Sequence, residues 1–337
     1  MALMFSPLRC RRFLWPMAAW LAFTAAAATA QPTAKPHAST WPSQPVRLLV
    51  GFPAGSSPDL VARAIAEPLS KALGQPVIVD NRPGASGNIA ATLVAQAADN
   101  HTLGVMINGN MTIAKLLNPA THYDPLKDLK PVSLVCTAPL LLAAPAAAPG
   151  GNVQEFLQAA RAAGTKWSYG SPGVGTVGHL AMELLKSKAN IAPVHVPYPS
   201  YQRVVAAMIA GEIQLSMVQL GAAAPQVAAG KLKPIGVTSA TRSPLAPEYP
   251  SLAEAGLPGF ELEVWTAVAA PASMDPEITA KLSSLISTIA RSEEVRRQLA
   301  QLGYNGVGID ADGLARRVKA DYDQLSRIIA AQGIRHE

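Results

Sequence analysis

The chain is short of aromatic residues, charged residues and cysteine, and each shortage excludes a class of protein. Aromatic side chains make up 5% of its 337 residues, too few for the stacking surface that single-stranded nucleic acids need. Charged residues make up 15% and hydrophobic residues 49%, which excludes a disordered or coiled-coil chain and provides enough apolar material for two lobes. No long Lys/Arg run occurs, so we expect no nucleic-acid partner.

Only one apolar run is long, and it lies at the N-terminus. Three arginines precede residues 13–28, which carry no charge, and Ala28-Thr29-Ala30 supplies the small residues that a signal peptidase needs. We predict a signal peptide over residues 1–30, cleaved near Ala30, and a flexible lead-in over 31–40, so the protein is exported. Removing the three arginines from the 28 basic residues leaves 25 against 22 acidic ones, a net charge of +3.

Two cysteines are present, and neither predicts a disulfide. Cys10 precedes the apolar run and leaves with the signal peptide, whereas a lipoprotein cysteine would follow that run. Cys136 is then alone, which excludes an internal disulfide. Its neighbours in residues 132–136 (VSLVC) predict a buried strand in which Cys136 is a small hydrophobic side chain rather than a nucleophile.

Strand and helix patterns alternate along the chain from about Trp41. Residues 45–52 (PVRLLVGF) are typical of a buried parallel strand. Ser57 and Pro58 then predict the N-cap and first turn of a helix that ends at Gly74. The alternation predicts an α/β fold with open, mostly parallel sheets. Further strands are expected at 76–80, 103–107, 167–170, 194–196 and 213–218.

Two loops of small residues each open a helix after a strand. In residues 52–59 (FPAGSSPD), the small side chains let a ligand approach the backbone, and the serines add hydroxyl donors. In residues 173–178 (GVGTVG), glycines expose backbone N–H groups at a helix N-terminus. A helix N-terminus carries partial positive charge, so both loops predict an anion site. A plain capping role for Ser57 is the alternative.

The second loop is also a formal G-x-G-x-x-G, a pattern found in dinucleotide-binding proteins. That interpretation requires an acidic residue at the end of the next strand, where this chain has residues 195–198 (HVPY). An exported protein also lies outside the compartment that maintains nicotinamide cofactors. We therefore expect no cofactor.

Catalytic and metal-binding patterns are missing from the sequence. It has no H-E-x-x-H and no C-x-x-C, and residues 84–87 (GASG) lack the spacing of a nucleophile elbow. His179 and Glu183 lie four residues apart and could share a metal, but a capping or surface pair is the better interpretation. We expect no enzyme, no catalytic residue and no metal, with a secreted hydrolase or oxidoreductase as the alternative.

Six segments, taken together, resemble the Bug-type (TctC) substrate-binding proteins of tripartite tricarboxylate transporters. The resemblance covers about Trp41 to the C-terminus and implies a periplasmic, monomeric solute-binding protein. Such a protein captures a small carboxylate and passes it to the membrane subunits of the transporter. A receptor-like module that signals to a membrane sensor is the alternative. The segments are residues 52–59 (FPAGSSPD), 81–90 (NRPGASGNIA), 169–184 (YGSPGVGTVGHLAMEL), 195–198 (HVPY), 250–259 (PSLAEAGLPG) and 265–271 (WTAVAAP).

The resemblance also implies a type II-like periplasmic-binding-protein fold, the Venus flytrap, in which two crossover strands join two α/β lobes. By analogy, lobe 1 is residues 41–137 plus 263–337 and lobe 2 is residues 138–262. Family members hold a ligand carboxylate between the two helix-opening loops. The positions that match the family's motifs are Phe52, Ala54, Gly55, Ser56, Asp59 and Asn108 on lobe 1, and Ser171, Gly173, Thr176 and His179 on lobe 2.

The chain departs from the family at the distal end of the pocket. Residues 198–203 (YPSYQR) stand where the family often reads Y-K-G-S-A-P, and Val218 and Gln219 stand where an Asp is common. The ammonium of an amino acid would then lack an anionic partner, and its burial would cost several kcal/mol. Arg203 could instead bind a second carboxylate. We therefore expect a dicarboxylate or an aromatic carboxylate, with Tyr198, Ser200, Arg203 and Gln219 at the distal end.

Overall fold

The computed structural model describes residues 41–334, so the predicted signal peptide and lead-in lie outside the described residues. Within that range no helix is both long and apolar enough to cross a membrane. The strands are β1 (Val46–Val50), β2 (Val77–Asn81), β3 (Thr102–Ile107), β4 (Leu129–Pro145), β5 (Ser168–Ser171), β6 (Val194–Pro197), β7 (Ser216–Gln219), β8 (Leu232–Val237), β9 (Glu263–Pro271) and β10 (Asn305–Ile309). The helices are α1 (Ser57–Leu73), α2 (Asn88–Ala95), α3 (Asn108–Met111), α4 (Ala114–Leu117), α5 (Val153–Ala163), α6 (Val177–Ala189), α7 (Tyr201–Ile209), α8 (Leu220–Ala228), α9 (Pro276–Arg291), α10 (Glu293–Gln301) and α11 (Ala311–Gln332).

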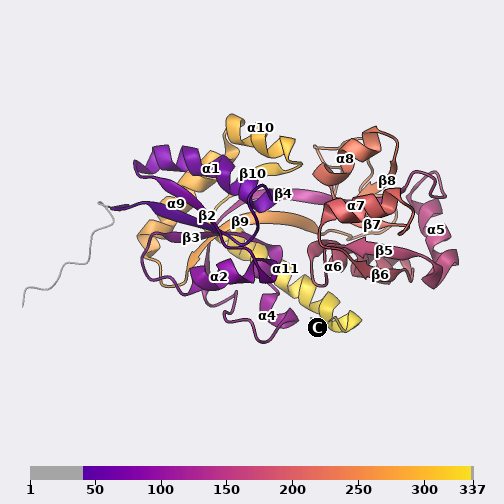
Figure 1. The fold of residues 1–337 in the computed structure, drawn as a ribbon, viewed down its shortest axis with the longest axis horizontal. Helices are drawn as coiled ribbons and strands as arrows, with labels where there is room; N and C mark the ends of the chain where they lie inside the picture. The colour runs from indigo at the N-terminus through magenta and orange to yellow at the C-terminus, as the bar shows by residue number, and fades with distance from the viewer. Residues whose placement is uncertain (1–40, 335–337) are drawn as a thin grey trace, which may run out of the picture. The chain divides into compact units, whose positions relative to one another are not determined.

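Strand β4 connects two groups of elements. Its first part pairs with β9 and β10, and its last residues, from Leu140 on, pair with β7 and β8. The main sheet has the order β10-β4-β9-β3-β1-β2, while β5 and β6 form a separate two-stranded sheet. Figure 1 shows β4 and β9 as the strands that run between the two groups.

The expectation of mostly parallel sheets is right for part of the fold only. Strand β1 runs parallel to β2 and β3, and β5 runs parallel to β6. Every described partner of β4 is antiparallel to it, and β9 is antiparallel to β3. The reason is topological, because the chain leaves the first group along β4 and returns along β9 in the opposite direction.

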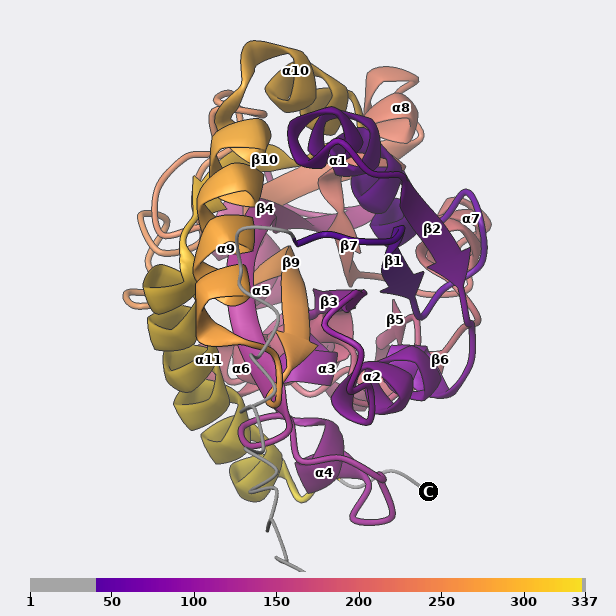
Figure 2. The same cartoon turned by 90° about the vertical axis from the view of Figure 1, so that its left-hand side faces the viewer.

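Buried apolar side chains form separate cores on either side of the connection. In the first group, α1, α9 and α10 pack on one face of the sheet, and α2 and the start of α11 pack on the other (Figure 2). Cys136 is free and fully buried in the first of these cores, as predicted, and burial raises the pKa of its thiol.

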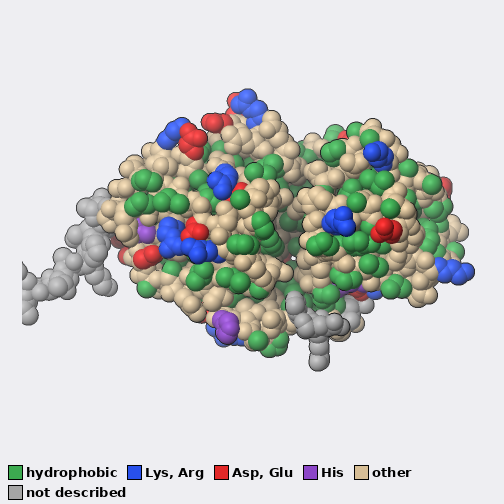
Figure 3. All heavy atoms as spheres, viewed as in Figure 1, with side chains coloured by type: hydrophobic (Ala, Val, Ile, Leu, Met, Phe, Trp, Pro, Cys, Tyr) green, Lys and Arg blue, Asp and Glu red, His purple; other side chains and the backbone are tan. Residues whose placement is uncertain are grey.

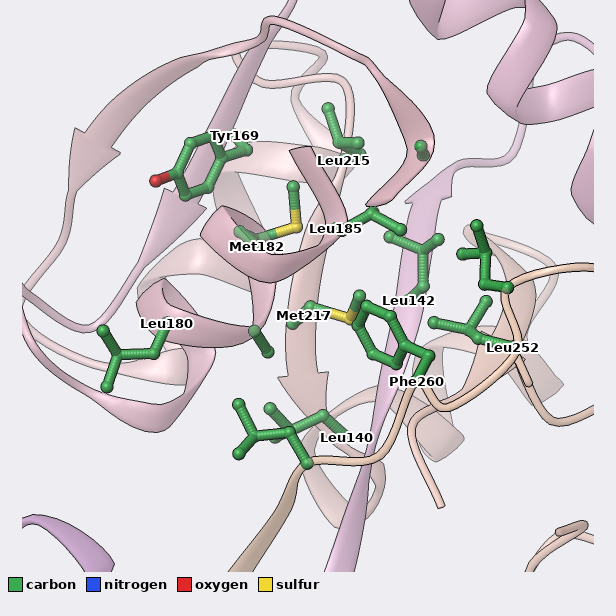
Figure 4. Close-up of a cluster of buried hydrophobic side chains, with 14 of the residues drawn as sticks. Leu140, Leu142, Tyr169, Leu180, Met182, Leu185, Leu215, Met217, Leu252 and Phe260 are labelled. Atoms are coloured by element: carbon green, nitrogen blue, oxygen red, sulfur yellow. The ribbon is translucent and has the colours of Figure 1, made fainter. Parts of the chain in front are cut away.

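In the second group, α5 and α6 cover one face of β4 and β7, and α7 and α8 cover the other. Figure 4 shows the packing of Met182, Leu185 and Met217 of this group around Leu142 and Phe260. Helix α11 belongs to both groups, since Leu314 packs in the first and Leu325 in the second.

Candidate functional site

The first predicted loop follows β1 and is shaped from the inside by Asp59. This carboxylate is 1% exposed. It accepts hydrogen bonds from the Gly55 amide (2.8 Å), the Asn81 side chain (2.9 Å) and Arg63 Nε (3.0 Å). Burial would raise the pKa of Asp59, but the hydrogen bonds from Arg63, Gly55 and Asn81 together hold it below its usual value. Asp59 is therefore ionised at neutral pH and ties α1 to the end of β2.

The outer side of the same loop presents one unpaired hydroxyl, that of Ser56, and open space at Gly55. Ser56 is the N-cap of α1, one residue before the predicted Ser57, and its side chain makes no capping hydrogen bond. The Ser56 hydroxyl oxygen is buried and has no hydrogen-bond partner among the described residues. Gly55 has φ +80°, and a β-carbon there would meet nothing within 4 Å. A buried hydroxyl without a partner is costly, so this loop is arranged to receive a polar ligand.

The second predicted loop follows β5 and is held by side chains beneath it. The Thr176 hydroxyl donates to the Gly173 carbonyl (2.8 Å) and accepts from the His179 amide as the cap of α6. Nδ1 of His179 accepts from the Gly175 amide (3.2 Å). Burial and the neighbouring His195 lower the pKa of His179 to about 4. The imidazole is therefore neutral at pH 7, as its acceptor role requires.

A polar network continues behind this loop. Ser171 Oγ lies 2.7 Å from Nε2 of His195 and also bonds the Gly173 backbone. Glu183 accepts from the Tyr169 hydroxyl (2.5 Å) and from Lys186 (2.7 Å). His179 and Glu183 thus have structural partners, and no group of three His, Cys, Asp or Glu in residues 41–334 is arranged to hold a metal.

The second loop has open space around its backbone at Gly173. Gly173 has φ +127°, and a β-carbon there would meet nothing within 4 Å. Val174 at the tip is exposed. Ser171, Thr176 and His179 use the polar atoms named above to shape the loop, and Ser171 and His179 engage the N–H groups of Gly173 and Gly175. We therefore interpret them as the frame of the loop and the N-terminus of α6 as the surface that meets an anion.

The remaining predicted residues divide between the frame and the surface. Asn108 is fully buried, and its amide bonds the Trp265 amide N–H (2.8 Å) and the Glu263 carbonyl (3.0 Å), which ties β3 to β9. Phe52 is half-buried and Ala54 is exposed at the first loop. Ser200 caps α7 by accepting from the Arg203 amide, and Arg203 itself is exposed.

Two tyrosines adjoin the loops, Tyr304 beside the first and Tyr201 beside the second. Tyr304 is 3% exposed. Its hydroxyl oxygen accepts a hydrogen bond from the Gln219 side chain (3.3 Å) and lies beside Ser57 of α1. Burial, above all, raises the pKa of Tyr304. Tyr201 lies under the start of α6, where a β-carbon on Gly178 would come within 2.7 Å of its hydroxyl oxygen. Tyr201 lies in residues 198–203, which the sequence comparison singled out, whereas Tyr304 belongs to no recognisable motif, so no signal in the sequence marks it.

Charged side chains on the face drawn in Figure 3 are mostly scattered, and a mixed cluster lies over β2. Asp80 of β2 pairs with both Arg47 and Arg82 at 2.9 Å. These arginines are therefore compensated locally, and exposed pairs of this kind contribute little to stability.

Comparison with known proteins gives one consistent family. The chain matches, over residues 61–334, the family model described as tripartite tricarboxylate transporter family receptor. The UPF0065 protein from the tcbD–tcbE intergenic region of Pseudomonas sp. (strain P51) is 34% identical over 311 residues, which cover 92% of each chain.

Solved structures of similar proteins agree with this family. The chain is 32% identical to R. palustris Rpa4515 with adipate, with a TM-score of 0.78, covering 88% of this chain and 99% of that one. It is 32% identical to MatC from Rhodopseudomonas palustris with bound malate, with a TM-score of 0.74, covering 86% and 100%. The predicted α/β fold of a two-lobed periplasmic binding protein is thereby confirmed.

Proposed function

Because the chain belongs to the tripartite tricarboxylate transporter receptor family and is a periplasmic solute-binding protein rather than an enzyme, we propose that it captures a dicarboxylate or an aromatic carboxylate. The ligand is then passed to the membrane subunits of such a transporter. One carboxylate group lies between the loop at Gly55 and Ser56 and the loop at Gly173. The observation that best supports this proposal is the buried Ser56 hydroxyl at the N-terminus of α1. It has no hydrogen-bond partner among the described residues.

We also propose the division into lobes, with lobe 1 at residues 41–137 plus 263–337 and lobe 2 at 138–262. The change of β4 partners at Pro139 and Leu140 supports these boundaries, as does the start of β9 at Glu263. The second half of α11 packs against the core of the second group, so this helix is a third connection. Residues 1–30 are proposed as the cleaved signal peptide that delivers the protein to the periplasm.

The proposed preference against amino acids depends on whether a side chain near the site could pair with an ammonium. Asp59 is buried and fully engaged, Val218 is buried, and Gln219 is paired with Tyr304. Glu212 lies beside the Tyr198 hydroxyl but is exposed, where water screens its charge. An ammonium in the closed site would therefore lose its hydration without gaining an anionic partner. The adipate and malate of the two similar structures are both dicarboxylates without an ammonium.

A thermal-shift panel tests this proposal. The mature protein should be stabilised by a C4–C6 dicarboxylate or a benzoate-type acid and not by glutamate or aspartate. A ligand at 100 times its Kd adds about 2.7 kcal/mol of stability, an easily measured shift. Stabilisation by glutamate would contradict the ammonium argument, and loss of that effect in Glu212→Gln would identify the ammonium's partner.

Arg203 is the proposed partner of the second carboxylate. It is exposed at the start of α7, and no ion pair to it occurs among the described residues. Arg203→Ala should weaken dicarboxylate binding about tenfold, in keeping with a charge-assisted hydrogen bond, and leave a monocarboxylate unaffected. Calorimetric titration of both ligands decides this, with the exposed Arg327→Ala as the control. An equal change for both ligands would remove Arg203 from the site.

A further inference from the structure

The turn at residues 302–304 touches the start of α8 backbone to backbone. A β-carbon on Gly221 would lie 2.7 Å from the Leu302 carbonyl oxygen, and a β-carbon on Gly303 would lie 2.8 Å from the Gly221 nitrogen. Gly303 also has φ +79°, a conformation that favours glycine. The two segments therefore meet without room for a side chain. In the proposed division they belong to different lobes.

This contact lies beside the crossover strand β4. Asn305, which follows the turn, pairs with Thr137 of β4, and Gln219, which precedes α8, pairs with Leu140. The two contacting segments thus flank Ala138 and Pro139, where β4 exchanges one group of partners for the other. A movement of one lobe against the other about this strand has to change the contact.

Tyr304 carries the contact into the ligand site. Its hydroxyl oxygen accepts from Nε2 of Gln219 at 3.3 Å, and the same hydroxyl lies beside Ser57, the first residue of α1. The side chain is almost completely buried, so loss of the Gln219 bond is not fully compensated by water. One hydroxyl group therefore adjoins the first ligand loop and the other lobe at once.

We propose that Tyr304 is a positioning residue for ligand binding: with Gln219 and the Gly221–Gly303 contact, it holds the lobes at the angle that brings the two loops together. The inference rests on the proposed function, because it requires both loops to bind the same ligand. Tyr304 acts through the lobe angle and not through the ligand. Removal of its hydroxyl therefore weakens the binding of every carboxylate ligand by the same factor, whatever the rest of the ligand is.

The first test uses Tyr304→Phe, Gln219→Leu and the double variant, titrated with adipate, malate and benzoate. Each single variant should weaken every acid that the parent binds by about fivefold, the worth of one neutral hydrogen bond. The double variant should weaken it by no more than that, because both changes remove the same bond. Tyr249→Phe, which removes a hydroxyl from a partly exposed tyrosine elsewhere in lobe 2, should change nothing. Unchanged affinity in Tyr304→Phe, or a loss confined to one acid, overturns the proposal.

The second test needs no ligand and so separates this inference from the proposed function. Gly221→Ala places a methyl group against the Leu302 carbonyl, which should force the lobes apart. The radius of gyration of the ligand-free variant, measured by small-angle scattering, should exceed that of the parent, while its circular dichroism stays the same. An unchanged radius in the folded variant overturns the proposal even where the parent binds a carboxylate. If the parent binds none of the acids and Gly221→Ala still opens, the proposed ligand class fails and the lobe contact stands.

Discussion

Replacing Gly173 with leucine is expected to weaken carboxylate binding by about 100-fold or more, equivalent to about 2.7 kcal/mol. Two causes act together. The φ of +127° is one that side chains rarely adopt, and the β-carbon would project into the open space where the anion approaches the backbone. Calorimetric titration of the variant measures the loss.

The matched control for this change is Gly230→Leu. Gly230 lies between α8 and β8, has φ +67° and has open space around its β-carbon position. The variant therefore also places a leucine at a positive φ, but away from both loops, and should bind like the parent protein. If Gly173→Leu binds like the parent as well, the second loop is a turn and not a ligand site.

Replacing Asp59 with alanine is expected to lower the free energy of unfolding by about 3 kcal/mol, since it leaves buried hydrogen-bonding groups without a partner. Gly55 and Asn81 lose their acceptor, so the first loop loses its shape and ligand affinity falls as well. Denaturant unfolding at pH 7 measures the stability. Asp323→Ala, which breaks an exposed pair with Lys319, is the control and should cost little.

The same carboxylate predicts a pH dependence. The folded-state pKa of Asp59 is below its usual value, so its contribution to stability is present above the unfolded pKa, near 4. That contribution is lost as the pH falls through the lower folded value. The parent should therefore lose more stability than Asp59→Asn between pH 5 and pH 2. If the two proteins lose the same unfolding free energy between pH 5 and pH 2, the Asp59 carboxylate does not make the stabilising hydrogen bonds described above.

The sequence predicted the position of both loops, because glycine and serine between a strand and a helix are a local signal. It did not predict which polar side chains are engaged within the loops themselves. Asp59, Ser171, Thr176 and His179 were all expected at the ligand site, and the structure shows that their polar atoms also hydrogen-bond within the protein and shape the loops. Whether a polar side chain points into or out of a loop depends on partners such as Asn81 and His195, which come from other strands.

Long-range features were the least accessible from the sequence. Alternation of strands and helices gave the α/β class but not the antiparallel direction of β9, which depends on the return of the chain. Tyr304 stands in no motif, and it meets Ser57 and Gln219 only because β10 pairs with β4. Contacts of this kind are made by the fold, so local patterns contain no signal for them.

We propose above all that the site accepts a carboxylate and rejects an ammonium. Adipate and 2-aminoadipate differ only by that group, so calorimetric titration of the mature protein with this pair is the most direct test. We expect adipate to bind at least 100-fold more tightly, because a buried ammonium without a partner costs several kcal/mol. Equal or tighter binding of 2-aminoadipate would contradict it.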